Sequence, residues 1–312
     1  MMELPKISCV VVTYNRKDYL YNCLNAIAKQ NFKPSSVYII DNASTDGTYE
    51  MLLNKHMVNT EFNGIIFYYI RLNENTGGAG GFYRGMKLAY ENETPDALWV
   101  MDDDGCPEPD CLKELAFYFD KYDYIAPLVL PYGNDNYLSF NYYGEKDVKK
   151  VIKESSYNDI IENYACPFNA ILYSSRLIKT IGYPNKDMFI WGDEIDYTLR
   201  AKKAGFQPMT IIRAIHRHPE DRMITKKFLW YPVIPIPLRW KAYFYYRNFT
   251  YNYIREQGFF SRFKFQIYQY FYLAIIKRNI KWIKTFNEAY RDGINADFSR
   301  THIYKQLIGK KE

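Results

Sequence analysis

The chain has 312 residues, of which 48% are hydrophobic, and a formal net charge of +6. This length and composition predict one large globular domain with an appended region and exclude an intrinsically disordered protein. The five cysteines are odd in number and scattered, which favours reduced thiols over a disulfide framework and argues against a structural zinc site.

Charge is divided unevenly along the chain. Residues 222–312 contain 18 Lys and Arg against 5 Asp and Glu, and they hold 24 of the 57 aromatic residues. Residues 1–221 have a balance of −7. Because charge and aromatic content change together, we predict two domains, 1–221 and 222–312.

The longest apolar runs, 228–238 and 267–276, are shorter than the roughly 20 residues that a transmembrane helix needs. No signal peptide is visible before the strand-like segment that follows Lys6. We therefore expect a cytoplasmic protein that is soluble or peripheral to the membrane.

Apolar runs and helical patterns alternate in the first part of the chain. In chain order they predict a strand at 7–13, a helix at 17–30, a strand at 37–40, a helix at 48–53, a strand at 65–70, a helix from about 80 to 90, and a strand at 97–101. This alternation predicts an α/β fold with a doubly wound, mostly parallel sheet. Ligand sites of such a sheet lie at the carboxyl ends of its strands.

Two later regions differ from this pattern. Residues 131–165 are polar and rich in Tyr and Asn, which predicts a loop or a small antiparallel excursion over the site. Prolines exclude a helix in 228–238, and three basic, aromatic, amphipathic helices are predicted after it, at 240–256, 259–277 and 280–291. They fit a helical subdomain packed on the catalytic core, or a face that also docks on anionic lipid.

Asp102, Asp103 and Asp104 directly follow the predicted strand 97–101. Three adjacent carboxylates repel one another unless a cation compensates their charge. Mn²⁺ or Mg²⁺ bridging two of them to a diphosphate would do so. A solvated acidic turn is the alternative, but the position after a buried strand favours the metal site.

A glycine-rich turn occupies residues 73–85 and opens a helix. After Asn73, Gly78 and Gly80 would let backbone N–H groups approach a phosphate or a sugar, although tight packing alone also explains glycines there. A dinucleotide fingerprint would follow the first strand, where Thr13, Asn15 and Arg16 lie instead. This argues against a Rossmann oxidoreductase, and the lack of a basic, glycine-rich loop argues against a nucleotidyltransferase.

Acidic residues begin another predicted helix, at Asp193, Glu194 and Asp196. One or two acids at a helix start are explained by the helix dipole. A group transfer with inversion of configuration at the reacting carbon also needs a carboxylate that takes the proton from the acceptor hydroxyl. We predict Glu194 as this general base, with Asp193 as the second candidate. His216 and His218 lie two apart on a strand-like segment, so they face the same side, and one of them is a predicted metal ligand unless the pair is merely structural.

Together, VVTYNR (11–16), DNASTDGT (41–48), the aspartate triplet and WGDEIDYTLRAKKAGF (191–206) resemble the family-2 glycosyltransferases of the GT-A fold. The combination of NENTGGAGGFYRGM (73–86), MDDDG (101–105) and a downstream His is similar to the galactofuranosyltransferase branch, which builds bacterial cell-wall and surface polysaccharides. The resemblance covers roughly residues 5–220.

This resemblance implies a metal-dependent, inverting transfer of galactofuranose from UDP-galactofuranose to a lipid-linked or polysaccharide acceptor. It implies that the nucleoside is held by Thr13, Asn15 and Asp41, with Arg16 near the diphosphate. Asp102 and Asp104 would face the diphosphate and the metal, and the additional His of the branch falls on His218. The donor site is completed by Asn73, Gly78, Gly80, Asp103 and Trp191.

The base of the branch falls on the acidic pair, where Glu194 stands in place of an Asp and one residue is inserted after Trp191. A rhamnosyltransferase that uses dTDP-rhamnose is the nearest alternative. A basic nucleic-acid-binding protein is the alternative from another class, but it leaves the acidic clusters unexplained. We expect the protein to lie peripherally on the inner face of the cell membrane. The sequence is compatible with both a monomer and a homo-oligomer.

Overall fold

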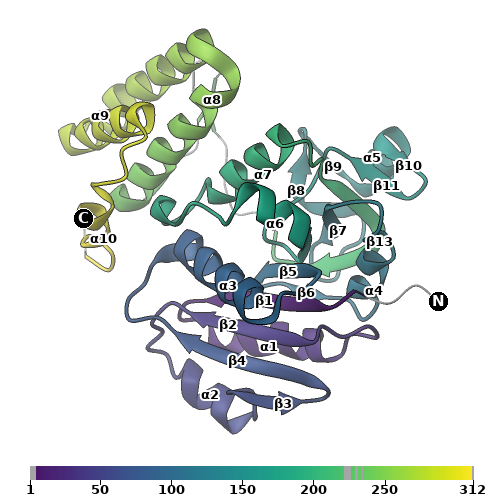
Figure 1. Cartoon of the computed structure of the whole chain (residues 1–312). Coiled ribbons are helices and arrows are strands. Elements are labelled where there is room, and N and C mark those ends of the chain that lie inside the picture. The colour runs from purple at the N-terminus through teal and green to yellow at the C-terminus, as the bar shows by residue number, and fades with distance from the viewer. Residues whose placement is uncertain (1–4, 221–225, 229–230, 234, 311–312) are drawn as a thin grey trace. The chain divides into compact units, whose positions relative to one another are not determined.

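Figure 1 shows a computed structural model of the chain, which describes residues 5–220, 226–228, 231–233 and 235–310. The chain divides into two compact units. The first unit consists of Met1–Pro184 and Tyr197–Asp221, and the second of Asn185–Asp196 and Arg222–Glu312. The short segment 185–196 thus groups with the C-terminal helices, which the charge pattern did not indicate.

Alternating strands and helices build the first half of the first unit, as the sequence predicts. The strands are β1 (Ile7–Thr13), β2 (Ser36–Asp41), β4 (Ile65–Arg71) and β5 (Ala97–Asp102), and the helices are α1 (Lys17–Ala28), α2 (Thr48–Asn54) and α3 (Gly77–Glu93). The α3 helix starts three residues earlier than expected, because Gly77–Gly81 of the turn already belong to it.

The central sheet has eleven strands, and its parallel part is the order β5-β1-β2-β4. Beyond β5 the order continues β12-β7-β13-β11-β10, where β7 and β13 are parallel and the other neighbours are antiparallel. The further strands are β3 (Thr60–Phe62), β6 (Cys106–Pro107), β7 (Tyr124–Leu130), β10 (Ser156–Tyr157), β11 (Ile160–Glu162), β12 (Ile171–Ser174) and β13 (Met209–Arg217). The predicted parallel core is therefore extended by a mixed half.

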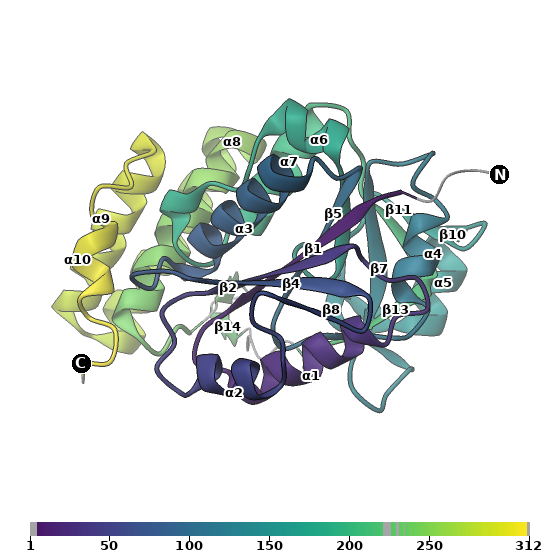
Figure 2. The same cartoon turned by 60° about the horizontal axis from the view of Figure 1, so that its bottom comes forward.

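Each face of this sheet is covered by helices. Cys9 and Val11 of β1 point to a core shared with α1, α2 and α4 (Cys111–Ala116), whereas Val10 and Val12 point to a core shared with α3, α6 (Ser175–Ile181) and the end of α7 (Asp193–Lys203). Figure 2 shows α3 and α1 on opposite faces. A strand buried on both faces needs a continuous apolar run, and ISCVVVT supplies it.

An antiparallel excursion follows β7, in the region predicted for it. The strands β8 (Tyr137–Tyr142) and β9 (Glu145–Asp147) pair with each other, and α5 (Val148–Ser155) follows. Leu138, Val148 and Val151 bury their side chains in a small core that they share with β7 and β11 of the central sheet.

Helices dominate the second unit. It contains a short 3-10 turn, η1 (Lys186–Met188), the strand pair β14 (Lys226–Phe228) and β15 (Tyr231–Val233), and the helices α8 (Arg239–Tyr272), α9 (Ile280–Asn295) and α10 (Thr301–Lys305). The first two predicted C-terminal helices are one continuous helix, so the predicted break after residue 256 is wrong. A glycine such as Gly258 costs only about 1 kcal/mol inside a helix, too little to end one of 34 residues.

The chain leaves α8 through a π turn, η2 (Leu273–Lys277), and Arg278 in the left-handed conformation (φ 47°). The α9 helix packs against α8 around Phe244, Tyr246 and Phe286. Within the described part of the chain, every helix is too short or too polar to cross a membrane.

Candidate active site

The carboxyl ends of the parallel strands bring the predicted donor residues to one edge of the sheet. Thr13 at the end of β1 pairs with Asp41 at the end of β2, and Asp41 pairs with Arg71 at the end of β4. On the other side of β1, Val12 pairs with Asp102, the last residue of β5. The motifs after β1, β2 and β5 are therefore neighbours in space, although up to 90 residues separate them in sequence.

Asp103 is the buried member of the aspartate triplet. Its side chain accepts a hydrogen bond from the Thr13 hydroxyl at 2.6 Å and one from an Arg16 guanidinium nitrogen at 3.2 Å. Burial raises the pKa of Asp103 to about 6, and the positive charge of Arg16 only partly offsets this effect. Asp103 thus lies behind the site surface, where it holds Thr13 and Arg16 in place.

Asp104 is flanked by two cationic or potentially cationic side chains. Arg16 contacts its Oδ2 at 2.8 Å, and the Nε2 atom of His218 lies 3.1 Å from its Oδ1. Burial opposes ionisation of Asp104, but the hydrogen bond and charge of His218, together with Arg16, outweigh it and lower the pKa. Asp104 is therefore an anion at neutral pH.

His218 is oriented by its surroundings. Its Nδ1 lies 2.7 Å from the Pro219 carbonyl oxygen, and the Phe140 ring lies 5.0 Å from its own ring. When Nδ1 donates to this carbonyl, the Nε2 of a protonated ring donates to Asp104, whereas the Nε2 of a neutral ring offers its lone pair to a cation. The Tyr132 hydroxyl also donates to the Asp104 carbonyl oxygen at 3.0 Å, so Tyr132 and Phe140 both contact the site.

His216 does not share this role, although it faces the same side of β13. Its side chain is buried, its Nδ1 has no hydrogen-bond partner in the described structure, and burial lowers its pKa to about 3. The ring is pressed against Gly105: a Cβ atom at that position would lie 2.0 Å from the His216 Nε2. His216 is thus a neutral packing residue under the loop that follows the triplet, and His218 is the histidine that contacts an aspartate of the triplet.

A second group of interactions organises the end of β2. Asp41 is 1% exposed, and its carboxylate accepts hydrogen bonds from the Ser44 backbone N–H at 2.8 Å and the Tyr69 hydroxyl at 2.6 Å. Asn15, in a left-handed conformation, accepts a bond from the Thr45 N–H at 2.7 Å. These contacts fix the loops after β1 and β2 to each other and place the exposed Arg71 beside Asp41.

Asn42 supports the glycine-rich turn. It is 2% exposed, and its side-chain oxygen accepts hydrogen bonds from the Thr76 N–H at 3.1 Å and hydroxyl at 2.8 Å, while its nitrogen donates to the Gly77 carbonyl at 3.1 Å. A Cβ on Gly80 would collide with Thr76, whereas a Cβ on Gly78 would meet nothing within 4 Å. Gly80 is therefore required by packing, and the backbone at Gly78 borders open space.

The acidic segment belongs to the second unit. Asp193 and Asp196 are buried, and Glu194 is half-buried. The Oε2 of Glu194 accepts a hydrogen bond from the Gly192 N–H at 2.8 Å, at the start of α7. Trp191 stands just before it, with its ring 5.6 Å from the Lys241 ammonium.

Residues 8–177, more than half of the chain, match the family described as Glycosyl transferase family 2. The chain belongs to glycosyl transferase family 2. Galactofuranosyltransferase GlfT1 of Mycolicibacterium smegmatis is 27% identical over 228 residues, which span 70% of this chain and 72% of GlfT1. GlfT1 of Mycobacterium tuberculosis is 26% identical over 222 residues, which span 68% of this chain and 70% of that relative. The expected likeness to the galactofuranosyltransferase branch is confirmed.

Solved structures agree with the GT-A fold expected for family 2. Residues 1–349 of Staphylococcus aureus TarS align with a TM-score of 0.53 and 14% identity, covering 97% of this chain and 91% of that one. The mannosyltransferase PcManGT from Pyrobaculum calidifontis, in complex with GDP-Man and Mn²⁺, also gives a TM-score of 0.53 at 14% identity, covering 100% and 82%. The chain is thus a glycosyltransferase with a GT-A-type α/β fold.

A divalent cation fits two side chains of this family-2 site. In octahedral coordination with bonds of about 2.1 Å, two neighbouring ligand atoms are about 3 Å apart, and the Asp104 Oδ1 and His218 Nε2 are 3.1 Å apart. No set of three His, Cys, Asp or Glu side chains gathers around one point in the described residues. Mg²⁺ sites commonly use only one or two carboxylates and complete their coordination with substrate phosphates and water, so two ligands are compatible with a cation that arrives with a diphosphate.

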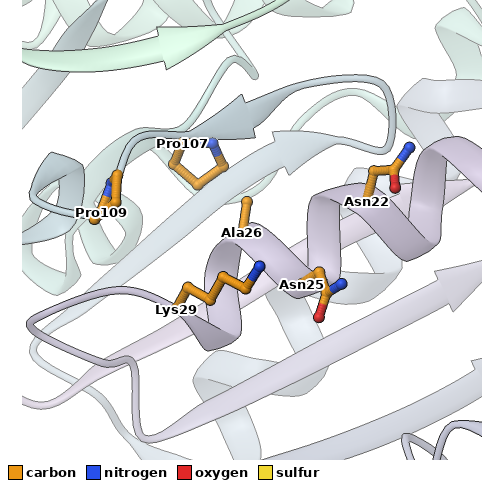
Figure 3. Close-up of a pocket in the computed structure, with 6 residues that line it drawn as sticks. All are labelled: Asn22, Asn25, Ala26, Lys29, Pro107 and Pro109. Carbon is orange, nitrogen blue, oxygen red and sulfur yellow. The ribbon is translucent and has the colours of Figure 1, made fainter.

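A hollow of the same unit lies between α1 and residues 107–109 (Figure 3). Its lining, which includes Asn22, Lys29 and Pro107, contains none of the predicted site residues. Nearby, Gln30 donates to the Glu108 carbonyl at 2.7 Å and accepts from the Leu112 N–H at 2.9 Å. Gln30 thus anchors the chain that leaves the aspartate triplet, a support that its place at the end of a predicted helix did not reveal.

Proposed function

We propose that this family-2 enzyme transfers galactofuranose from UDP-galactofuranose to a lipid-linked or polysaccharide acceptor in bacterial surface glycan synthesis, with inversion and with Mn²⁺ or Mg²⁺. The observation that carries the metal-dependent mechanism is the arrangement of Asp104 between His218 and Arg16 at the carboxyl edge of the sheet. The choice of donor rests on the likeness to GlfT1 along most of both chains.

Asp104 and His218 would hold the cation, and Asp102 would face the diphosphate beside them. The cation supplies positive charge that neutralises the leaving diphosphate. Arg16 is half-exposed and bound to Asp103 and Asp104, so its guanidinium can turn from Asp104 to a phosphate oxygen while Asp103 keeps hold of it. Such an exchange lets one arginine compensate the acidic triplet before the donor binds and the diphosphate afterwards.

The remaining donor assignments follow the loops at the same edge. Asn15 and the loop after Asp41 would border the nucleoside. Thr13 and Asp41 are buried, so they would support these loops through their hydrogen bonds. The backbone around Gly78 would approach the donor sugar, because a side chain there would meet nothing within 4 Å. Asn73, at the exposed start of this turn, and Trp191 complete the proposed contacts.

Glu194 would act as the general base. The acceptor oxygen attacks the anomeric carbon, the bond from that carbon to the diphosphate oxygen breaks, and the carboxylate of Glu194 takes the hydroxyl proton. A positioned base of this kind contributes about 10²–10⁴-fold to the rate. Asp193, buried at the helix start, would support the site without receiving the proton.

Substitution of the two acids tests this assignment. Glu194→Gln keeps the shape of the side chain but removes its basicity, so kcat should fall by about 10²–10⁴-fold while UDP still binds with wild-type affinity in calorimetry. Asp193→Asn is the matched control and should have the smaller effect. If Asp193→Asn abolished turnover while Glu194→Gln kept it near the wild-type level, Asp193 would be the base instead of Glu194.

We further propose that the second unit docks on the anionic inner face of the membrane, where a lipid-linked acceptor resides. Around the turn from α8 to α9, Phe271, Ile275 and Ile280 are 49%, 47% and 83% exposed. The basic side chains Arg278 and Lys281 are exposed between and beside them. Apolar side chains that enter the interface and basic ones that meet lipid phosphates are the combination that such surfaces use.

Flotation with vesicles tests this surface without truncating the chain. The double substitution Phe271→Ser and Ile280→Ser should release the protein from vesicles that contain anionic lipid, while transfer to a water-soluble acceptor remains. As a control, the exposed Ile66 on β4 can be replaced by Ser. Equal flotation of all three proteins would exclude this surface.

A further inference from the structure

The segment that leads to the acidic cluster has a strained backbone. Phe189 and Trp191 adopt positive φ angles of 69° and 57°, and Gly192 follows with 93°. Positive φ in a bulky residue is energetically unfavourable and persists only where surrounding contacts impose it. Contacts within the second unit must therefore hold the backbone of residues 189–192 in this conformation.

The contacts come from one side of α8. The side-chain nitrogen of Asn248 lies 2.9 Å from the Met188 carbonyl oxygen, 2.9 Å from that of Ile190 and 2.6 Å from that of Trp191. One turn further along α8, the Asn252 side chain donates to the Gly192 carbonyl at 2.8 Å. Both asparagines are buried, so water does not compete for these bonds.

Arg247 determines which way the Asn248 amide points. Its Nε donates to the Asn248 Oδ1 at 2.9 Å, which directs the NH₂ group of the amide to the backbone carbonyls. Arg247 also donates to the Met188 carbonyl at 2.9 Å and is itself fully buried. A buried guanidinium is retained at a considerable desolvation cost, which indicates that this arrangement has a use beyond packing.

Gly192 connects this arrangement to the carboxylate. An added Cβ would lie 2.9 Å from the Asn248 Cβ, so α8 is in close contact with the glycine. The N–H of the same Gly192 donates to the Glu194 Oε2 at 2.8 Å. A continuous chain of hydrogen bonds therefore runs from Asn248 of α8 through the Trp191–Gly192 peptide group to Glu194, and Asn252 binds the next carbonyl, that of Gly192.

We propose that Asn248, together with Arg247 and Asn252, is a positioning residue that fixes the carboxylate of Glu194 for proton transfer. This inference rests on the proposed role of Glu194 as the base. It gives α8 a function in the chemical step, although α8 lies outside residues 8–177 that match the family. The helical unit is thus part of the catalytic machinery as well as a candidate membrane surface.

The substitution Asn248→Asp tests the role of the amide donors. The aspartate has nearly the same shape but cannot donate to the three carbonyls, so the strained segment should relax and kcat should fall about 10²-fold, the loss typical of a misplacement near 1 Å. The KM for the donor should change much less than kcat, because Trp191 is the one proposed donor contact in the segment that relaxes. The matched control is Thr250→Val on the same helix, since Thr250 is buried and its hydroxyl has no hydrogen-bond partner among the described residues.

A double-mutant cycle separates positioning from general destabilisation. If Asn248 acts through Glu194, adding Asn248→Asp to Glu194→Gln should cost no further activity. If the losses multiply, or if Asn248→Asp alone leaves kcat unchanged while Glu194→Gln lowers it, the positioning role is refuted and the base assignment stands. If Glu194→Gln alone keeps wild-type kcat, the base assignment is wrong and the positioning role falls with it.

Discussion

Replacing Asp103 by Asn should stabilise the folded protein at neutral pH and impair its activity. The side chain is 3% exposed, and burial raises the pKa of Asp103 to about 6 in spite of the contacts with Thr13 and Arg16. An ionised carboxylate at this position is therefore unfavourable for folding, and its retention points to a use in the site.

The magnitude follows from proton linkage. The pKa is about 6 in the folded chain against an ordinary value of 3.8, and each pH unit of difference corresponds to about 1.36 kcal/mol, which gives about 3 kcal/mol. Between these two pH values the folded protein keeps a proton that the unfolded chain has lost. The stability contributed by this group is therefore complete below pH 3.8 and is lost as the pH rises through 6.

Denaturant unfolding of the wild type and Asp103→Asn at pH 4.5 and pH 7.5 measures this effect. Asn cannot ionise but keeps an oxygen that accepts the Thr13 hydroxyl, so the stability advantage of the variant should grow by about 2 kcal/mol between the two pH values. Transfer activity should fall because Arg16 loses one of its two carboxylates. The exposed Asp120 provides the control, since Asp120→Asn should change stability by less than about 0.5 kcal/mol at either pH. A variant that is less stable than the wild type at pH 7.5, or a stability advantage that is independent of pH, would show that burial of Asp103 does not oppose its ionisation.

Two further substitutions test the supports of the site. Gly105→Ala should destabilise the protein by about 1–3 kcal/mol and lower activity, because the new methyl group would overlap the buried His216 ring, and adding His216→Ala should recover part of this loss in unfolding experiments. Asn42→Ala should raise the KM for the donor and cost about 1–3 kcal/mol of unfolding free energy, because it leaves Thr76 and Gly77 without their buried partner. An unchanged KM in steady-state kinetics would show that the glycine-rich turn does not contact the donor.

The parallel core of the fold could be predicted from the sequence because its signals are local. Each strand buried on both faces is a continuous apolar run, and the polar motifs follow directly after these runs. The mixed half of the sheet could not be predicted in the same way. The strand β12 inserts antiparallel between β5 and β7, a pairing between distant segments that leaves no periodic pattern in any one of them.

The sequence indicated the charged residues of the candidate site, but it did not indicate the buried residues that hold them in place. The aspartate triplet stands out because three adjacent carboxylates need compensation, yet nothing in the sequence shows that Asp103 is buried while Asp104 meets His218. Asn42 and Asn248 could not be found either, because a single asparagine is unremarkable until the backbone groups it binds are known. The predicted break after residue 256 falls next to Gly258, and a glycine inside a helix costs only about 1 kcal/mol, so α8 continues through it.

Transfer from defined nucleotide sugars, with and without a chelator, tests both the proposed donor and the proposed metal site. Purified full-length protein would be incubated with UDP-galactofuranose or dTDP-rhamnose and a lipid-linked acceptor, and glycosylated lipid would be quantified. We expect product from UDP-galactofuranose only. Chelation should abolish it and Mn²⁺ should restore it, and the His218→Ala variant should need more Mn²⁺ than the wild type. Full activity in the presence of the chelator, or an equal Mn²⁺ requirement in wild type and variant, would contradict the proposed Asp104–His218 metal site, and product from dTDP-rhamnose instead would contradict the proposed donor.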